Sequence, residues 1–216
     1  VNLVENKFPH LRNHLSKCKS PMMMLGSMIR LWMEEKGVER DKYMVIAMMP
    51  CVAKKEEVNR PELRDPATRK KDVDYSLTVR EMSQLIRARG IDWMALPGKF
   101  KTTYDEPFAT SSGSGALFGV SGGVTEAALR VAYTYLTKED VTRENADIFD
   151  EVRTVLRRPG LVLGTQVDVT PKARFHRNLD IAVISGTRNI QQYLQEAKLL
   201  DPENMPTSGM KHFIEC

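Results

Sequence analysis

The chain contains few cysteines, few aromatic residues and no long hydrophobic run. Its 216 residues include three cysteines, Cys18, Cys51 and Cys216, and aromatic residues make up 7% of the total. An odd number of cysteines without regular spacing argues against a disulfide framework and leaves metal ligands or free thiols. No apolar stretch approaches the about 20 residues that a membrane-spanning helix needs, and the first residues do not resemble a signal peptide. We therefore expect no membrane segment in this fragment.

An excess of charge of one sign is also missing. The formal net charge is +4, and the densest basic run, residues 69–71, lies between Asp65 and Asp72. A basic run flanked by acidic residues is typical of a charged loop and not of an arm that binds nucleic acid. Nucleic acid is therefore not an expected partner.

The order of apolar patterns predicts an α/β protein. Strands are predicted at residues 43–49, 75–77, 91–96, 160–169, 179–185 and 212–216. Helices are predicted at residues 1–16, with an interruption near Pro9, and at residues 20–37, 78–88, 123–136, 146–156 and 187–199. The helix over 20–37 is apolar over so broad a surface that we expect it to be buried on most sides. The expected core face of the helix over 123–136 consists of Val124, Ala127, Ala128, Val131 and Leu136.

Residues 48–57 combine side chains that suit metal chemistry. They follow an apolar run and read Met-Met-Pro-Cys-Val-Ala-Lys-Lys-Glu-Glu. If a helix starts just after Cys51, its free N–H groups, its dipole and Lys54 one turn on favour the thiolate, the form that binds metals. Glu57 lies one turn beyond Lys54, so the two can share a helix face. On spacing alone, a more common case than a metal ligand is a small buried cysteine followed by a charged helix face in contact with solvent.

The same stretch resembles the second cysteine signature of the iron-only ([FeFe]) hydrogenases. That signature reads Met-Pro-Cys-x-x-Lys-x-x-Glu and is followed closely by Arg-Pro, here Arg60-Pro61. Four further stretches resemble the family in the same order: residues 15–21, 72–81, 112–127 and 212–215. The resemblance implies an α/β fold of two lobes, each a small sheet flanked by helices, with the lobe boundary near residues 97–107.

The resemblance implies an H-cluster, which is a [4Fe-4S] cubane joined through a cysteine sulfur to a two-iron centre. A cubane takes four cysteine ligands, and Cys51 matches the one in the second signature. The family's first and third cysteine motifs are missing, because the chain opens at Val1 just after the first and stops at Cys216 just before the third. We therefore expect residues 1–216 to be an internal fragment of a longer hydrogenase, inactive by itself, with Cys18 and Cys216 structural or incidental.

The resemblance also implies roles for individual side chains. Ser16 and Glu57 match residues of a proton relay, and Lys54 matches a cation that binds a cyanide ligand of the two-iron centre, so these three are the expected catalytic residues. The residues expected to contact the cofactor are Pro21, Met22, Met49, Pro50, Phe118 and Gly119. The family usually has Gln where Met22 stands, and that Gln touches the two-iron centre. The pocket expected around this centre therefore lacks a polar group. For this reason the resemblance does not establish the level of activity or the preferred direction of the reaction.

The glycine-rich stretch at residues 112–123 does not fit a nucleotide site. Phe118 occupies the third glycine position of the G-x-G-x-x-G pattern, and no Lys-Ser or Lys-Thr pair follows for a P-loop. We expect the small residues here to let the backbone approach a bulky prosthetic group.

The activity implied by the resemblance is the reversible reduction of protons to H2, with electrons from ferredoxin or a similar carrier, in anaerobic hydrogen metabolism. The alternative is a hydrogenase-like sensory protein, or an iron-sulfur assembly or binding protein, without efficient H2 chemistry. Lys54, Glu57 and Ser16 favour the hydrogenase because a scaffold needs no proton path. The residues do not determine the compartment, and the cytoplasm is favoured over the periplasm.

Overall fold

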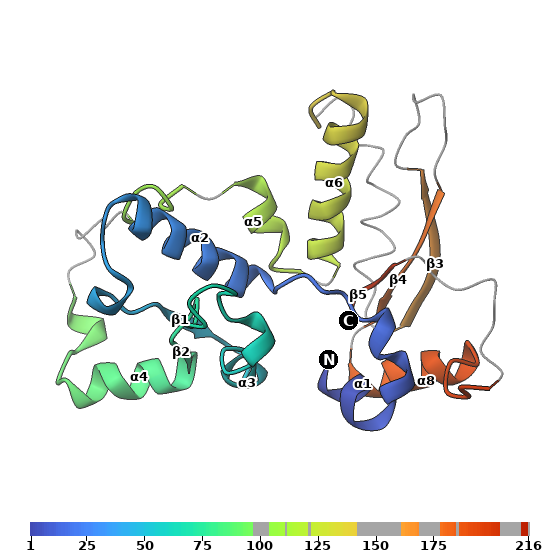
Figure 1. Cartoon of the computed structure of the whole chain (residues 1–216), viewed down its shortest axis with the longest axis horizontal. Helices are drawn as coiled ribbons and strands as arrows, with labels where there is room; N and C mark the ends of the chain where they lie inside the picture. Colours follow the sequence, from blue (N-terminus) through green and yellow to red (C-terminus); the bar gives the residue numbers. More distant parts are fainter. Residues whose placement is uncertain are drawn as a thin grey trace. The chain divides into compact units, whose positions relative to one another are not determined.

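The structure is a computed structural model that describes residues 1–96, 104–110, 112–120, 122–141, 161–168, 178–184, 186–203 and 213–215. The chain divides into two compact units: unit 1 is Val1–Leu15 with Thr103–Cys216, and unit 2 is Ser16–Thr102. The described residues form helices together with two small sheets that contain parallel strand pairs (Figure 1), which confirms the α/β class. Two predicted segments, residues 97–103 of the linker and the helix over 146–156, lie outside the described residues.

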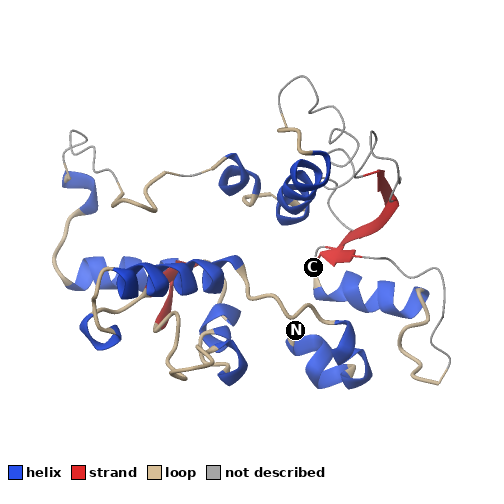
Figure 2. Ribbon diagram, turned by 45° about the horizontal axis from the view of Figure 1, so that its top comes forward, coloured by secondary structure: helices blue, strands red, loops and turns tan. Residues whose placement is uncertain are grey.

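Unit 2 is built around a two-stranded parallel sheet. Its elements are α2 (Pro21–Glu35), η2 (Arg40–Lys42), β1 (Ile46–Met49), α3 (Ala53–Glu57), η3 (Pro61–Leu63), β2 (Tyr75–Thr78), α4 (Val79–Ala88) and η4 (Trp93–Ala95). In the sheet, Ile46 pairs with Tyr75 and Met49 pairs with Thr78. More residues of this unit lie in helices than in strands (Figure 2). Because β1 and β2 run in parallel, the chain turns into a helix at the same end of both strands, into α3 after β1 and into α4 after β2.

The core of unit 2 joins α2 to the segments that flank α3 and β2. Met23, Val58 and Val73 are its buried members, and Met22, Val45, Ala47 and Leu63 pack against them. Helix α2 comes very close to the backbone before β2 at Gly26, where an added Cβ would lie 2.5 Å from Val73 Cγ2 and 3.1 Å from the Asp72 carbonyl oxygen. The absence of a side chain at Gly26 therefore sets how closely α2 packs.

The start signals of the helices in unit 2 are those predicted from the sequence. Ser20 is the N-cap of α2, and its side chain accepts a hydrogen bond from the Met23 amide, with Pro21 at the first helical position. Thr78 and Glu81 form a capping box at the start of α4, with both reciprocal bonds present.

Two predictions for unit 2 are wrong. Residues 91–96 do not form a strand: the Asp92 side chain accepts hydrogen bonds from the Met94 and Ala95 amides and starts the short helix η4, a local bond that competes with strand pairing. Helix α2 is not buried on most sides. Only Met23 and Gly26 are buried within it, and its exposed apolar residues include Met24, Leu25, Met28 and Leu31.

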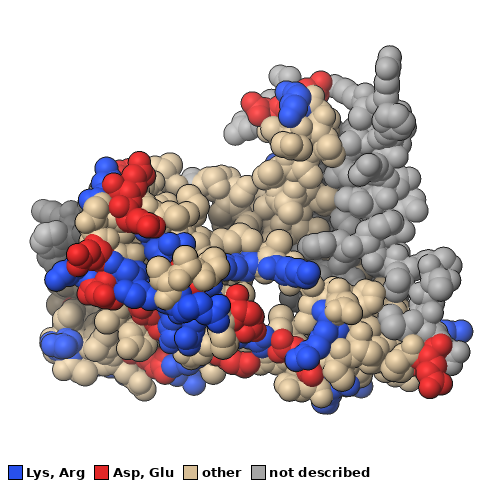
Figure 3. Space-filling model, viewed as in Figure 1, with Lys and Arg blue, Asp and Glu red and all other residues tan. Residues whose placement is uncertain are grey.

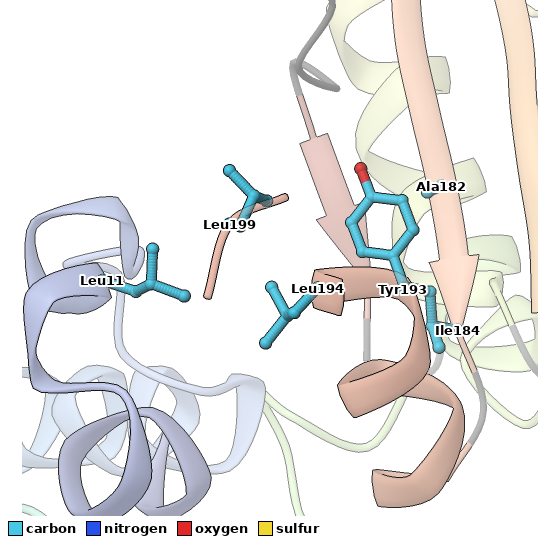
Figure 4. Close-up of a cluster of buried hydrophobic side chains, with 6 residues drawn as sticks. All are labelled: Leu11, Ala182, Ile184, Tyr193, Leu194 and Leu199. Carbon is cyan, nitrogen blue, oxygen red and sulfur yellow. The ribbon is translucent and has the colours of Figure 1, made fainter. Parts of the chain in front are cut away.

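Unit 1 contains α1 (Asn2–Lys7), η1 (Pro9–His14), α5 (Gly113–Leu117), α6 (Gly123–Thr137), β3 (Leu161–Asp168), β4 (Asn178–Ile184), α8 (Thr187–Glu196) and β5 (Phe213–Glu215). Its sheet has the order β3-β4-β5, with β3 antiparallel and β5 parallel to β4. Figure 4 shows its buried cluster, in which the members are Leu11, Ala182, Ile184, Tyr193, Leu194 and Leu199. This cluster joins η1 to α8 and to Leu199 just after it, and a 2.9 Å hydrogen bond joins His10 Nε2 to the Leu199 carbonyl oxygen.

The predicted core face of α6 is wrong except at Ala127. Val124, Val131 and Leu136 are exposed, whereas Leu129 and Tyr133 are buried. The helix also buries Glu126, whose carboxylate accepts bonds of 2.8 and 3.0 Å from Arg130 one turn on. A charged residue that is neutralised on its own helix can face inward, and the apolar pattern alone does not indicate this.

The capping box makes α4 sensitive to acid. Hydrogen bonds from Lys55 and from Thr78 lower the pKa of Glu81 from 4.5 to about 2. A carboxyl group with a lowered pKa contributes stability that is present above about pH 4.5 and is lost as the pH falls towards about 2. We expect urea unfolding between pH 6 and pH 3 to show a smaller loss of stability for Glu81→Gln than for the wild type, because Gln keeps the capping bond but not the charge. Equal losses would contradict this assignment.

Candidate functional site

Strand β1 delivers Cys51 to the surface of unit 2. The strand ends at Met49, Pro50 follows, and α3 begins at Ala53. Cys51 is a free, exposed cysteine in the turn between them. Its carbonyl oxygen accepts a 3.3 Å hydrogen bond from the Lys54 amide, so the turn leads directly into the helix. The predicted order of strand, cysteine and short charged helix is confirmed.

Helix α3 is anchored at two points although it has only five residues. At its end, Val58 is buried in the core of unit 2. On another side, the Lys55 ammonium group pairs with the Glu81 carboxylate of α4. The short helix therefore holds its remaining polar side chains in a defined place near Cys51.

Lys54 and Glu57 form an ion pair on α3. The Lys54 Nζ atom lies 2.7 Å from Glu57 Oε2, and the two side chains are 24% and 18% exposed. Burial raises the pKa of Glu57, but hydrogen bonds from Lys54 and Ser20 outweigh it, so the pKa lies below its ordinary value of 4.5. Glu57 is therefore an ionised acceptor near neutral pH and orients the Lys54 ammonium group.

Ser20 is a neighbour of this site that sequence reasoning did not single out. It was expected to cap α2, and it does, but its hydroxyl and its backbone amide also contribute hydrogen bonds to Glu57. The Ser-Pro pair was the only available signal, and it indicates a helix start, not a contact with a residue 37 positions later.

Ser16 lies on the exposed segment that leads to Ser20. Its Oγ atom accepts a 3.2 Å hydrogen bond from the Cys18 amide. Among the described residues of unit 2, the hydrogen bonds to Glu57 from a serine come from Ser20, whereas Ser16 contacts Cys18. The relay role of Ser16 stays a prediction.

The expected cofactor-contacting residues of unit 2 lie at the start of α2 and at the end of β1. Met22 is partly buried against the core at the start of α2, where Pro21 is exposed at the first helical position. Met49 is half-buried at the end of β1, and Pro50 is exposed beside Cys51. Met49, Pro50 and Cys51 thus follow one another at the strand end.

Phe118 and Gly119 belong to unit 1, at the end of α5. Phe118 is 41% exposed. A Cβ added at Gly119 would have only the Ala116 carbonyl oxygen nearby, at 3.7 Å, so packing within unit 1 does not require glycine there. A groove of about 750 Å³ lies beside them and is lined by Gly113, Ser114, Leu117, Arg130, Val131, Thr134, Tyr135, Asp140 and Val141, which include no cysteine. The predicted contact of Phe118 and Gly119 with a cofactor stays a prediction.

The donor atoms present fit one corner of an iron-sulfur cluster. Among the described residues, no three His, Cys, Asp or Glu side chains gather closely enough to hold a metal ion. Cys51 offers one exposed thiol, and a cubane requires four thiolate-type ligands. Cys51 could therefore supply one ligand of such a cluster, and a full set of four ligands is not gathered among the described residues.

The surface around the site carries charges of both signs. Lys and Arg side chains alternate with Asp and Glu side chains over the face of unit 2 in Figure 3.

In the part of the chain that the structure describes, no helix has both the length and the apolar character needed to cross a bilayer.

Comparisons with known proteins point to one family. Residues 1–216 match the family model described as iron only hydrogenase large subunit, C-terminal domain. The chain is 36% identical over 199 residues to the periplasmic [Fe] hydrogenase large subunit of Nitratidesulfovibrio vulgaris, a match that covers 90% of this chain and 42% of the relative. It is also 30% identical over 231 residues to the cytosolic Fe-S cluster assembly factor NAR1 of Sclerotinia sclerotiorum, which covers 95% of this chain and 38% of that protein.

The fold is similar to that of a solved hydrogenase. A variant of the apo [FeFe]-hydrogenase HydA1 from Chlamydomonas reinhardtii superposes with a TM-score of 0.69 at 24% identity, over 100% of this chain and 55% of that chain. This likeness supports the two-lobed α/β fold. The chain spans less than half of the length of the two curated relatives.

Proposed function

We propose that this chain, which belongs to the family of the iron-only hydrogenase large subunit, C-terminal domain, forms part of a domain that reversibly reduces protons to H2. The observation that carries the proposal is the exposed Cys51 at the end of β1, followed on α3 by the half-buried Lys54–Glu57 pair. We call the longer protein that would contain residues 1–216 the parent protein. Ferredoxin or a similar carrier would supply its electrons.

The proposed cofactor is the H-cluster, a [4Fe-4S] cubane with a two-iron centre, which when bound supplies the redox chemistry. Cys51 would provide one cubane ligand. Met49 and Pro50, beside Cys51, would shield the sulfur on the strand side, and Pro21 and Met22 would do so from the start of α2. An apolar surround limits the access of water and tunes a metal site.

Lys54 and Glu57 would act as a unit. The Lys54 ammonium group, held by Glu57, is suited to donate a charge-assisted hydrogen bond to an anionic ligand. Glu57 is ionised near neutral pH and has carboxylate oxygens that can take up a proton, although its bonds to Lys54 and Ser20 hold its pKa below 4.5. The Ser16 hydroxyl can donate and accept without changing its charge, which suits a place further along a proton path.

Substitutions on α3 test these roles. In the parent protein, we expect Lys54→Ala to reduce loading of the two-iron centre by about tenfold to a hundredfold, because one charge-assisted bond is lost. We expect Glu57→Gln to slow H2 evolution by about tenfold or more, since the amide can neither carry the proton nor pair with Lys54. Iron content, infrared bands of the loaded centre and H2 production measure both effects.

Lys55→Ala provides the matched control. Lys55 is the next residue on the same short helix, but it pairs with Glu81. Because Val58 still anchors α3 in the core, we expect this variant to lose much less loading and turnover than Lys54→Ala. If Lys54→Ala and Lys55→Ala behave alike, Lys54 has no specific role at the cofactor.

A second candidate function is iron-sulfur assembly or binding, or sensing, without efficient H2 chemistry. The observation in its favour is the 30% identity to a protein named as a cytosolic Fe-S cluster assembly factor, over 95% of this chain. Such a protein has no evident use for the roles proposed for Lys54 and Glu57, which are binding of an anionic ligand and proton transfer. We therefore place this function second. A parent protein that binds a cubane, accepts no two-iron centre and makes no H2 would favour it.

A further inference from the structure

Asp72 is the most fully enclosed acidic residue in unit 2. Its side chain has 0% exposure. Its Oδ2 atom accepts hydrogen bonds from Lys19 Nζ and, at 2.7 Å, from Ser27 Oγ, and its Oδ1 atom accepts a 2.9 Å bond from Arg30 Nε. A buried carboxylate needs such partners, because an unpaired charge in this position would be strongly destabilising.

Two of these three partners lie on α2, and the third lies just before it. Ser27 and Arg30 belong to α2, whereas Lys19 is the residue before the N-cap, Ser20. The Lys19 ammonium group also reaches Ser27 Oγ at 3.3 Å. Asp72 therefore holds both the helix and the segment that enters it.

The backbone of Asp72 is fixed to the same helix. Gly26 of α2 lies against its carbonyl oxygen, so closely that a Cβ there would be at 3.1 Å. Asp72 thus contacts α2 through both its backbone and its side chain. Lys19, in contrast, lies outside the helix, and its ammonium group contacts Asp72 and Ser27.

We propose that Asp72 is a positioning residue, which acts through Lys19 to fix the segment of residues 16–22 that carries Ser16, Pro21 and Met22. The inference rests on the proposed function, because that function gives this segment its role beside Cys51 and Glu57. Asp72 touches no proposed cofactor ligand or proton carrier directly. Its effect reaches the site through the chain between Lys19 and Ser20.

Asp65 offers a matched comparison within the same network. Its Oδ2 atom lies 2.9 Å from Arg30 Nη2, and its side chain is 6% exposed. Its other bonds are local, from the Ala67 and Thr68 amides and the Thr68 hydroxyl. Asp65 and Asp72 are thus both buried carboxylates bound to Arg30, but Asp72 alone of the two is bound to Lys19.

Hydrogen exchange of the 216-residue chain tests the proposal without any metal. The reporters are the Cys18 amide, which donates to Ser16 Oγ, and the Met23 and Met24 amides, which donate to Ser20. We expect Asp72→Asn and Lys19→Met to speed exchange at these amides by about tenfold, while Asp65→Asn leaves them near the wild-type rate. Lys19→Arg keeps a cation that reaches Asp72 and should restore slow exchange.

Because Asp72→Asn removes a buried charge and can prevent folding, the Lys19 variants keep the test decisive. Lys19 is 28% exposed, so its substitution leaves the core intact. Equal exchange in the Asp72→Asn and Asp65→Asn chains, or wild-type exchange in Lys19→Met, would overturn the proposal.

A second readout separates this inference from the proposed function. In the parent protein, Lys19→Met should slow H2 evolution and Lys19→Arg should restore it. Faster exchange at the Cys18, Met23 and Met24 amides with unchanged H2 evolution would overturn the positioning role. A parent protein that makes no H2 in its wild-type form would refute the proposed function, and the exchange rates would then still decide whether Asp72 and Lys19 fix the segment.

Discussion

We expect replacement of Cys51 with alanine in the parent protein to abolish the proposed H2 evolution and to leave the protein folded. The cysteine is exposed, so removing its sulfur opens no cavity in the core. A cubane that lacks one of its four thiolate ligands is not held in its normal form. We expect the iron content and the electron paramagnetic resonance signal of the cluster to fall together with the activity.

Cys18→Ala is the control for this experiment. Cys18 is also a free, exposed cysteine of unit 2, but it does not follow a strand end. We expect this variant to keep both cluster and activity. Retention of the cluster by Cys51→Ala, or an equal loss in the two variants, would contradict the assignment of Cys51 as a ligand.

Substitution of Gly123 by alanine disrupts the packing of α5 against α6. A Cβ at this position would lie 1.8 Å from the Leu117 carbonyl oxygen, 2.7 Å from the Leu117 carbonyl carbon and 3.3 Å from Phe118 Cα. These neighbours are backbone atoms, so no side-chain rotation can relieve the clash. We expect a loss of about 3 kcal/mol or more in the stability of unit 1, measured by chemical unfolding.

Gly113→Ala is a matched control from the same glycine-rich stretch. Gly113 is the first residue of α5, and no atom lies within 4 Å of a Cβ built there. Alanine also favours the helix, so this variant should be as stable as the wild type or slightly more so. Equal unfolding curves for Gly113→Ala and Gly123→Ala would show that the close approach at Gly123 is not a feature of the folded chain.

Local signals in the sequence predicted the part of the site that lies on one short segment. The apolar run before Pro50 predicts β1, and the spacing of Lys54 and Glu57 predicts a shared helix face. The structure confirms both, with the ion pair at 2.7 Å. The capping box of Thr78 and Glu81 was predictable for the same reason, because both partners lie within one turn.

Contacts between distant residues were not predictable from these patterns. Lys19 and Asp72 are 53 positions apart, and nothing in either neighbourhood indicates that they pair. The bonds from Ser20 to Glu57 likewise join residues far apart in the sequence, in a unit whose core packs Met23 of α2 against Val58, the residue after α3. Propensity and periodicity describe neighbours along the chain, whereas these contacts arise from tertiary packing.

The failed expectations for α2 and α6 have a common physical cause. An apolar pattern shows which side chains can be buried, but not which of them find a neighbour. Helix α2 approaches the rest of unit 2 at Gly26, so its contact face follows the smallest residue and not the largest apolar ones. Helix α6 buries Glu126 because Arg130 neutralises it.

The most direct test of the proposed function is H2 evolution from a reduced viologen by the parent protein, after maturation with a two-iron precursor. We predict H2 production that disappears in Cys51→Ala and persists in Cys18→Ala. A parent protein that assembles a cubane but produces no H2 after maturation would contradict the hydrogenase assignment and support the assembly or sensory alternative.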